Sequence, residues 1–90
     1  MYEFRWNDRN VDHIGEHGVK QAEAEFVVNH PAKGFPRREA DEKFRAWGQT
    51  IDGRYLQVVY IFDPPDVVYV IHARPLTDAE KHRLRQGKKW

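Results

Sequence analysis

The sequence has no cysteine and no long apolar segment, and each absence excludes a class of protein. Without cysteine there are no disulfides, no thiolate zinc sites and no thiol nucleophile. Small secreted domains usually depend on disulfides, so their absence favours a reducing compartment. The longest apolar run, Val67–Ile71, is far shorter than the roughly 20 residues of a membrane helix, and the N-terminal residues lack the apolar stretch of a signal peptide. We therefore expect a cytoplasmic protein without a membrane segment.

Ninety residues make room for one small domain, residues 1–90, and no repeat or linker divides them. Hydrophobic residues (40%) and aromatics (13%) favour a packed core over disorder, although 32% of the residues are charged. The net charge is only +1, yet basic residues gather near the end: Lys81, Arg83, Arg85, Lys88 and Lys89. This basic end either contacts phosphates or is a solvated helix end, where cations suit the helix dipole.

The hydrophobic pattern predicts an α+β fold: a small antiparallel sheet of three to four strands with helices packed around it, in the order β-α-α-β-β-β-α. The expected strands cover residues 2–6, 43–51, 55–62 and 67–74. The expected helices cover residues 8–17, 19–29 and 78–86. Residues 55–62 are apolar on both faces, which is typical of an inner strand.

Local signals support the boundaries of these elements. Gly18 predicts the end of the first helix, and Asp52-Gly53 predicts a hairpin between two strands. Pro64-Pro65 separates the next two strands, because proline cannot donate to a strand ladder. Thr77 and Glu80 have the spacing of a capping box, which starts the last helix. In the second helix we expect Ala22, Phe26 and Val27 to face inward.

One local motif resembles a metal site. His13-Ile14-Gly15-Glu16-His17 reads H-x-x-E-H, which places two imidazoles on one helix face with a glutamate beside them. Gly15 and Gly18 weaken the helix that would hold the two rings, and no third ligand is marked. We therefore expect no metal site.

Basic and aromatic side chains recur with a period of two on two expected strands. One face of residues 67–74 carries Val68, Val70, His72 and Arg74. One face of residues 43–51 carries Lys43, Arg45, Trp47 and Gln49. If the two faces coincide, guanidinium groups and an indole meet on a surface suited to single-stranded RNA. The alternative is that Trp47 lies in the core and the cations only rim the sheet.

Six short stretches match, in order and spacing, the motifs of one family over nearly the whole chain. They are Phe4–Asp8 ("F-x-W-D/N"), Glu16–Val19 ("K-H-G-V"), Ala22–Phe26 ("E-E-A-x-x-V-F"), Glu42–Gly48 ("E-x-R-F-x-x-I-G"), Val70–Pro75 ("I-I-S-A-R-K/P") and Glu80-Lys81 ("E-R"). On these motifs the chain resembles the BrnT-type toxins of bacterial type II toxin–antitoxin systems, which look like compact relatives of RelE-type ribonucleases.

The resemblance implies a RelE-like fold and a metal-independent RNA endonuclease that stops translation. It implies no cofactor. The implied partners are mRNA, with or without the ribosome, and a cognate ribbon-helix-helix antitoxin that neutralises the toxin. The sequence does not decide whether the chain also forms a homodimer.

Metal-free RNA cleavage needs a base, an acid and a cation that stabilises the phosphorane. The resemblance retains His17 and Arg74. We assign charge stabilisation to Arg74 and Arg45, and proton transfer to His17 and His72, because imidazole exchanges protons near neutral pH. His17 has an alternative role as a cap of the first helix. We expect further RNA contacts from Lys81, Trp47, Arg54 and Arg85, and we expect Arg74→Ala to abolish cleavage without lowering the melting temperature.

Three positions depart from the family pattern. Glu16 stands where the family has lysine, His72 where it has serine, and Leu84 where it commonly has tyrosine. These departures keep a second interpretation open: a catalytically degenerate relative that binds an antitoxin-like protein or RNA and cuts nothing.

Overall fold

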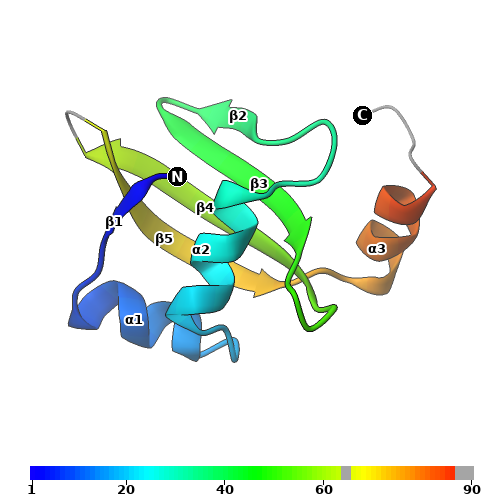
Figure 1. Ribbon diagram of the computed structural model, residues 1–90, viewed down its shortest axis with the longest axis horizontal. Coiled ribbons are helices and arrows are strands. Elements are labelled where there is room, and N and C mark those ends of the chain that lie inside the picture. Colours follow the sequence, from blue (N-terminus) through cyan, green and yellow to red (C-terminus); the bar gives the residue numbers. More distant parts are fainter. Residues whose placement is uncertain (64–65, 87–90) are drawn as a thin grey trace.

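The structure is a computed structural model that describes residues 1–63 and 66–86. In these residues a mixed β-sheet is the central element of the fold (Figure 1). Its five strands are β1 (Glu3–Arg5), β2 (Arg37–Ala40), β3 (Lys43–Gln49), β4 (Tyr55–Asp63) and β5 (Val67–Pro75). They lie in the order β1-β5-β4-β3-β2. The doubly apolar β4 is therefore central, as its sequence predicts. The expected turn at Pro64-Pro65 and the basic residues Lys88 and Lys89 fall outside the described residues.

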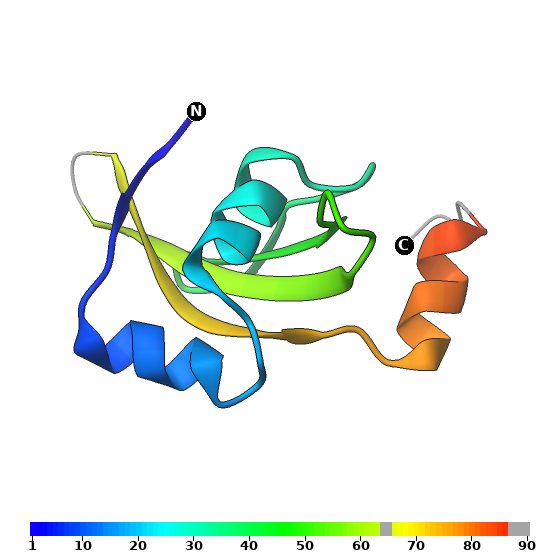
Figure 2. The same cartoon turned by 60° about the horizontal axis from the view of Figure 1, so that its bottom comes forward.

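Three helices accompany this sheet in the described residues: α1 (Asp8–Gly15), α2 (Gln21–Asn29) and α3 (Asp78–Arg85). Only α2 crosses a face of the sheet, whereas α1 lies beside β5 and α3 lies beyond the end of β5 (Figure 2). The α+β class and the order of the predicted elements are confirmed. None of these helices has the length and hydropathy of a membrane span.

The expectation of three to four antiparallel strands is wrong in two respects. β1 pairs parallel to β5, and the additional strand β2 pairs antiparallel to β3. The β2 sequence, Arg-Arg-Glu-Ala, has no alternating apolar pattern and no other sign of a strand. It forms as an edge strand because Asp41 and Glu42, with φ of 37° and 69°, make a tight hairpin turn.

The core lies between α2 and the sheet. α2 contributes Ala24, Val27 and Val28, whose i, i+3, i+4 spacing forms one helix face. Ala22, expected to face inward, is exposed, because it precedes that face by two residues. α2 packs closely because Gly48 lies beneath it: a Cβ there would be 3.1 Å from Cγ1 of Val27. The sheet adds fully buried side chains from three strands: Ala46, Leu56, Val58, Tyr60, Val68 and Val70.

A β-bulge divides β5 into two parts. Tyr60 of β4 pairs with Val70, but the neighbouring Val59 pairs with His72, so Ile71 is an extra residue. The expectation that Val68, Val70, His72 and Arg74 share one face is therefore wrong. Val68 and Val70 are fully buried on the α2 side, whereas His72 and Arg74 point to the opposite face.

Asn10 fixes α1 against β5 where β1 ends. Its Nδ2 donates to the carbonyls of Arg5 (3.2 Å) and Val70 (3.1 Å), and its Oδ1 accepts from the backbone N–H of Asn7 (2.8 Å). The side chain is 2% exposed. α1 thus continues the edge of the sheet where β1 stops, and it satisfies a strand carbonyl that would otherwise have no neighbour.

We expect Asn10→Ala to lower the free energy of unfolding by about 2 kcal/mol, because the buried carbonyl of Val70 and the part-buried carbonyl of Arg5 lose a donor. Urea denaturation measures this change. Gln21→Ala, an exposed substitution in α2, is the control and should stay within about 0.5 kcal/mol of the wild type. Equal unfolding midpoints for the two variants would contradict this role of Asn10.

Candidate active site

The face of the sheet opposite α2 carries the predicted site residues. Side chains directly opposite each other in neighbouring strands point to the same side. The strand register gives two such rows, Trp47–Gln57–Arg74 and Arg45–Val59–His72. The face of β3 that carries Arg45 and Trp47 therefore coincides with the face of β5 that carries His72 and Arg74, a condition that the sequence alone left open. We call this surface the open face, since no helix of the described residues crosses its middle (Figure 2).

Three imidazoles meet at the β5 edge of the open face. The ring centroid of His72 is 5.2 Å from that of His17 and 5.6 Å from that of His13, and the two rings of the α1 segment are 6.3 Å apart. His17 lies in the turn after α1, which ends two residues earlier than expected. The structure thus brings His17 and His72 together and adds His13. In the sequence, only the i, i+4 spacing of His13 from His17 indicated that His13 could lie near this site.

The environment of His72 favours its neutral form. Burial is the largest cause that lowers its pKa below the usual 6.5, and the nearby His17, His13 and Arg74 lower it further. A neutral imidazole has a free lone pair, which a general base requires. His72 is therefore suited to accept a proton at neutral pH.

His13 and His17 differ in their contacts. Nδ1 of His13 lies 4.0 Å from a carboxylate oxygen of Glu16. In the described residues the imidazole of His17 has ring contacts but no hydrogen bond to the α1 carbonyls, so a capping role for its side chain gains no support. Within residues 1–63 and 66–86, no three His, Asp or Glu side chains have the geometry to hold a metal ion.

Arg74 is held by a two-pronged ion pair. Its Nη1 and Nη2 donate to the two carboxylate oxygens of Glu80, at 2.8 and 3.0 Å. Nη1 also donates to the carbonyl of Pro75 (3.0 Å) and Nη2 to Oε1 of Gln57 (3.3 Å). All four terminal N–H groups therefore have acceptors, and the positive charge of Arg74 is balanced by a carboxylate.

This ion pair also stabilises α3. Hydrogen bonding from Arg74 lowers the pKa of Glu80 to about 2, and Glu80 in turn raises the pKa of Arg74. Glu80 completes the predicted capping box, since its Oε1 accepts from the N–H of Thr77 at 2.8 Å and its own N–H donates to Oγ1 of Thr77 at 3.1 Å. Arg74→Ala would leave the Glu80 carboxylate half-buried without its cation. The expectation that this variant keeps its melting temperature is therefore revised.

Trp47 is buried, with 2% of its surface exposed. Its ring stacks on Phe35 with centroids 5.1 Å apart, and its Nε1 donates to Oε1 of Gln57 at 3.0 Å. No ring face is free for an RNA base, so the base-stacking role suggested by the sequence does not fit and the core alternative does. Through Gln57, whose Oε1 also accepts from Arg74, Trp47 positions the guanidinium.

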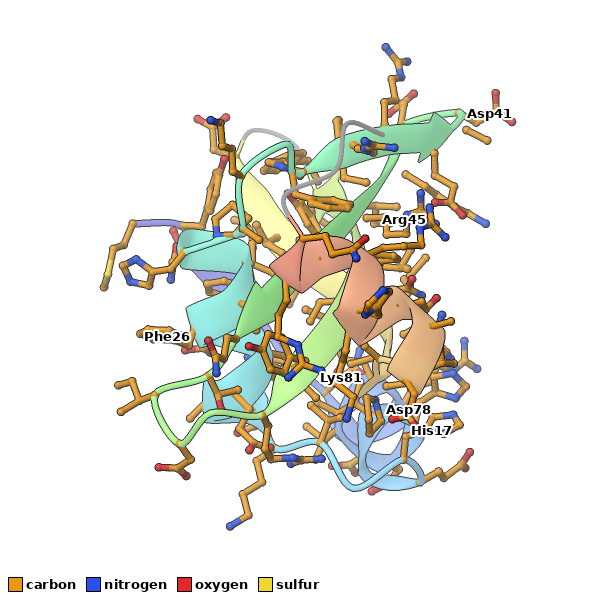
Figure 3. The ribbon with its side chains drawn as sticks, turned by 90° about the vertical axis from the view of Figure 1, so that its right-hand side faces the viewer. His17, Phe26, Asp41, Arg45, Asp78 and Lys81 are labelled. Carbon is orange, nitrogen blue, oxygen red and sulfur yellow. The ribbon has the colours of Figure 1, made fainter. Side chains whose placement is uncertain are left out.

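The other predicted cations are dispersed and partnered. Nε of Arg45 lies 3.3 Å from a carboxylate oxygen of Glu39. This N–H group is buried and has no hydrogen-bond acceptor in good alignment. Arg45 lies two strands from His72, about 10 Å by strand spacing. Figure 3 shows Arg45 and His17 on well-separated parts of the molecule.

The three remaining predicted RNA contacts each have a partner of their own. Nζ of Lys81 is 3.4 Å from Asp78 within α3, and the guanidinium of Arg85 lies 5.7 Å from the ring centre of Tyr55. Arg54 follows the β3–β4 turn and pairs with Glu23 at 2.8 Å. It also donates to the carbonyl of Gly18, the residue after His17.

A pocket of about 330 Å³ adjoins the histidine cluster. It lies between α1 and β5 and is lined by Arg9, Asn10, His13, Tyr69 and Ile71. His13 belongs to both the pocket and the cluster. Sequence reasoning did not identify Arg9 or Tyr69, although Arg9 continues the i, i+4 stripe of His13 and His17.

We expect Glu80→Gln to lower the free energy of unfolding at pH 7 by about 2 kcal/mol, because a charge-assisted pair with Arg74 is lost. The pKa of Glu80 is depressed in the folded state, so this stability is present above the unfolded value near 4.5 and disappears as the pH falls towards 2. Denaturant unfolding at pH 7, 4 and 2.5 measures it. A difference between wild type and variant that does not change with pH would contradict the assignment.

We expect the imidazole of His72 to titrate below pH 6.5, and His17→Gln to raise the pKa of His72 by removing a neighbouring positive charge. The rise is partial, because burial, the main cause, remains. NMR titration of the imidazole C–H resonances measures both values. His30→Gln, a change at the end of α2, is the control and should leave the pKa of His72 unchanged.

Comparisons with known proteins identify the fold. No protein-family model and no curated protein matches the chain. A search of solved structures finds the crystal structure of the Brucella abortus ribonuclease toxin BrnT, with a TM-score of 0.63 and 21% sequence identity. The match covers 87% of this chain and 100% of the toxin. The chain therefore has the fold of the BrnT ribonuclease toxin.

Proposed function

We propose that this chain is the toxin of a type II toxin–antitoxin system and acts in the cytoplasm as a metal-independent RNA endonuclease. One observation carries the proposal: three imidazoles converge on the open face of a fold shared with a ribonuclease toxin. Imidazoles supply the proton transfers that RNA cleavage requires without a metal ion.

In the proposed reaction, neutral His72 accepts the proton of a ribose 2′-hydroxyl, whose oxygen attacks the adjacent phosphorus. The bond from phosphorus to the 5′-oxygen breaks, and protonated His17 donates a proton to that oxygen. The products are a 2′,3′-cyclic phosphate and a 5′-hydroxyl. The lowered pKa of His72 supports its role as the base.

Arg74 is the proposed cation for the charged phosphorane, because its charge acts on His72 across the same face of β5. Glu80 balances that charge in the free protein. A phosphate that displaces the Glu80 carboxylate would gain the guanidinium, so the ion pair restrains activity until substrate binds. Arg45 and Lys81, each paired with a carboxylate, are secondary contacts to the RNA backbone.

The proposed partners follow from the family resemblance and from the fold. The substrate is mRNA, and the neutralising partner is a ribbon-helix-helix antitoxin. Expression of the chain alone should arrest bacterial growth, and co-expression of the protein encoded beside it should restore growth.

A second candidate function is a non-catalytic binding module that pairs with an antitoxin-like protein or with RNA. The hydrogen bonds of Arg74 favour this candidate, because all its terminal N–H groups already have acceptors. Glu16 and Leu84, which depart from the family pattern, also favour it. This candidate predicts harmless expression at high level, and RNA binding without cleavage products.

We expect His72→Gln and His17→Gln each to slow cleavage of a labelled single-stranded RNA by 10²–10⁴-fold, an order-of-magnitude estimate for loss of a general acid or base. The assay contains EDTA and detects the cyclic phosphate end. His30→Gln is the matched control and should cleave like the wild type. Wild-type protein that releases no product while binding RNA would favour the second candidate.

Glu80→Gln and the double variant Arg74→Ala/Glu80→Gln separate structure from catalysis. Both lose the same ion pair and so lose similar stability, but only the double variant loses the guanidinium. We expect Glu80→Gln to keep cleavage activity at a temperature where it is folded, and the double variant to lose it. Equal activity of the two would remove Arg74 from the mechanism.

A further inference from the structure

The pocket between α1 and β5 contains the arginine that best fits a role in substrate binding. Arg5, Arg45, Arg54 and Arg74 each form an ion pair with a carboxylate. Within residues 1–63 and 66–86, the exposed guanidinium of Arg9 has neither an ion pair nor a hydrogen bond. Arg9 is thus a cation at the histidine cluster whose charge is not balanced by direct contact.

The position of Arg9 gives it no stabilising role in α1. It lies in the first turn of the helix, where the helix dipole is positive and disfavours a cation. Asp8, in the same turn, is the residue that suits this end. A basic side chain at such a position is better explained by a negatively charged ligand than by helix stability.

Tyr69 gives the same pocket a rigid aromatic wall. The guanidinium of Arg5 lies 4.3 Å from the centre of the Tyr69 ring, and the Tyr69 hydroxyl is 3.4 Å from Oδ1 of Asn7. These contacts from β1 and the start of α1 hold the ring in place. An aromatic ring fixed beside a free cation is the pairing that single-stranded nucleic acids use, with a base on the ring and a phosphate on the cation.

The pocket has the size and position of a subsite for one nucleotide. Its volume of about 330 Å³ is at the lower end of the range of small-ligand sites, about 300–1,000 Å³. His13 is shared with the histidine cluster, so a nucleotide in the pocket is a direct neighbour of the phosphate at His17 and His72. A base reaches Tyr69 only when it is unpaired, which points to single-stranded RNA.

We propose that Arg9, His13 and Tyr69 form a nucleotide subsite: Arg9 and His13 bind a phosphate of single-stranded RNA, and Tyr69 packs against the adjacent base. This inference rests on the proposed ribonuclease function and deepens it. Arg9, His13 and Tyr69 bind and position the strand, while His17 and His72 carry out the proton transfers.

The test is binding of a fluorescein-labelled 2′-O-methyl RNA 12-mer of mixed sequence, which has no attacking hydroxyl and stays intact. Fluorescence anisotropy at several salt concentrations gives the Kd and its salt dependence. We expect Arg9→Ala to weaken binding about tenfold and to reduce the slope of log K against log salt by about 0.7, the value for one phosphate contact on a single strand. Arg38→Ala, which removes an exposed arginine from edge strand β2, is the matched control and should change neither quantity.

Tyr69→Leu tests the base contact. We expect binding to weaken roughly 5- to 150-fold, the range for one lost stacking contact, with no change in the salt slope. A 12-mer without bases should bind equally to wild type and Tyr69→Leu, which separates lost stacking from damage to the fold. Thermal melting confirms that each variant is folded at the assay temperature.

The outcomes distinguish this inference from the proposed function. Equal Kd values and salt slopes for Arg9→Ala and Arg38→Ala, or a Tyr69→Leu variant that binds the 12-mer like the wild type, overturn the subsite. If the wild type still cleaves unmodified RNA, the ribonuclease proposal stands without it. If the wild type neither binds the 12-mer nor cleaves RNA, both are overturned.

Discussion

The buried amide of Asn10 is the contact on which the candidate site depends. It joins α1 to the carbonyls of Arg5 and Val70, and so fixes the helix beside β5 at the point where β1 ends. His13 lies three residues further along that helix, and the turn that follows it carries His17. Without this docking, the two imidazoles of the α1 segment would have no fixed relation to His72. A small domain has few buried polar contacts, and here one of them determines the geometry of a surface cluster.

Carboxylates balance the positive charge of three arginines that were predicted to act on RNA. Glu80, Glu39 and Glu23 each hold an arginine that the sequence pattern marks for RNA. Such pairs fix side-chain positions, and they also reduce the field that a phosphate would meet. This explains how a chain with 15 Lys and Arg residues and 14 Asp and Glu residues has so few unbalanced cations near its histidines.

Sequence reasoning predicted the helices, the three long strands and the central position of β4, because periodicity and capping residues act over a few positions. It missed β2, whose charged residues become a strand only through the hairpin turn at Asp41-Glu42. It also placed Val70 and His72 on one face, because a strict period of two cannot register the bulge at Ile71. At the site, His17, His72 and Arg74 were identified from motif and residue type. Their partners were not, since Glu80 and Gln57 come from other elements, and Arg9 and Tyr69 match no motif.

Because of the bulge at Ile71, the side chains of the two parts of β5 that matter here face opposite sides of the sheet. Before it, alternate side chains fill the interior beneath α2; after it, the outward positions face the histidine cluster and Glu80. The extra residue moves the pattern by one place. Without the bulge, strict alternation along β5 would turn His72 and Arg74 towards the interior with Val68 and Val70, and Ala73 outward. The bulge thus puts the imidazole of His72 and the guanidinium of Arg74 on the open face, while Val68 and Val70 stay in the core.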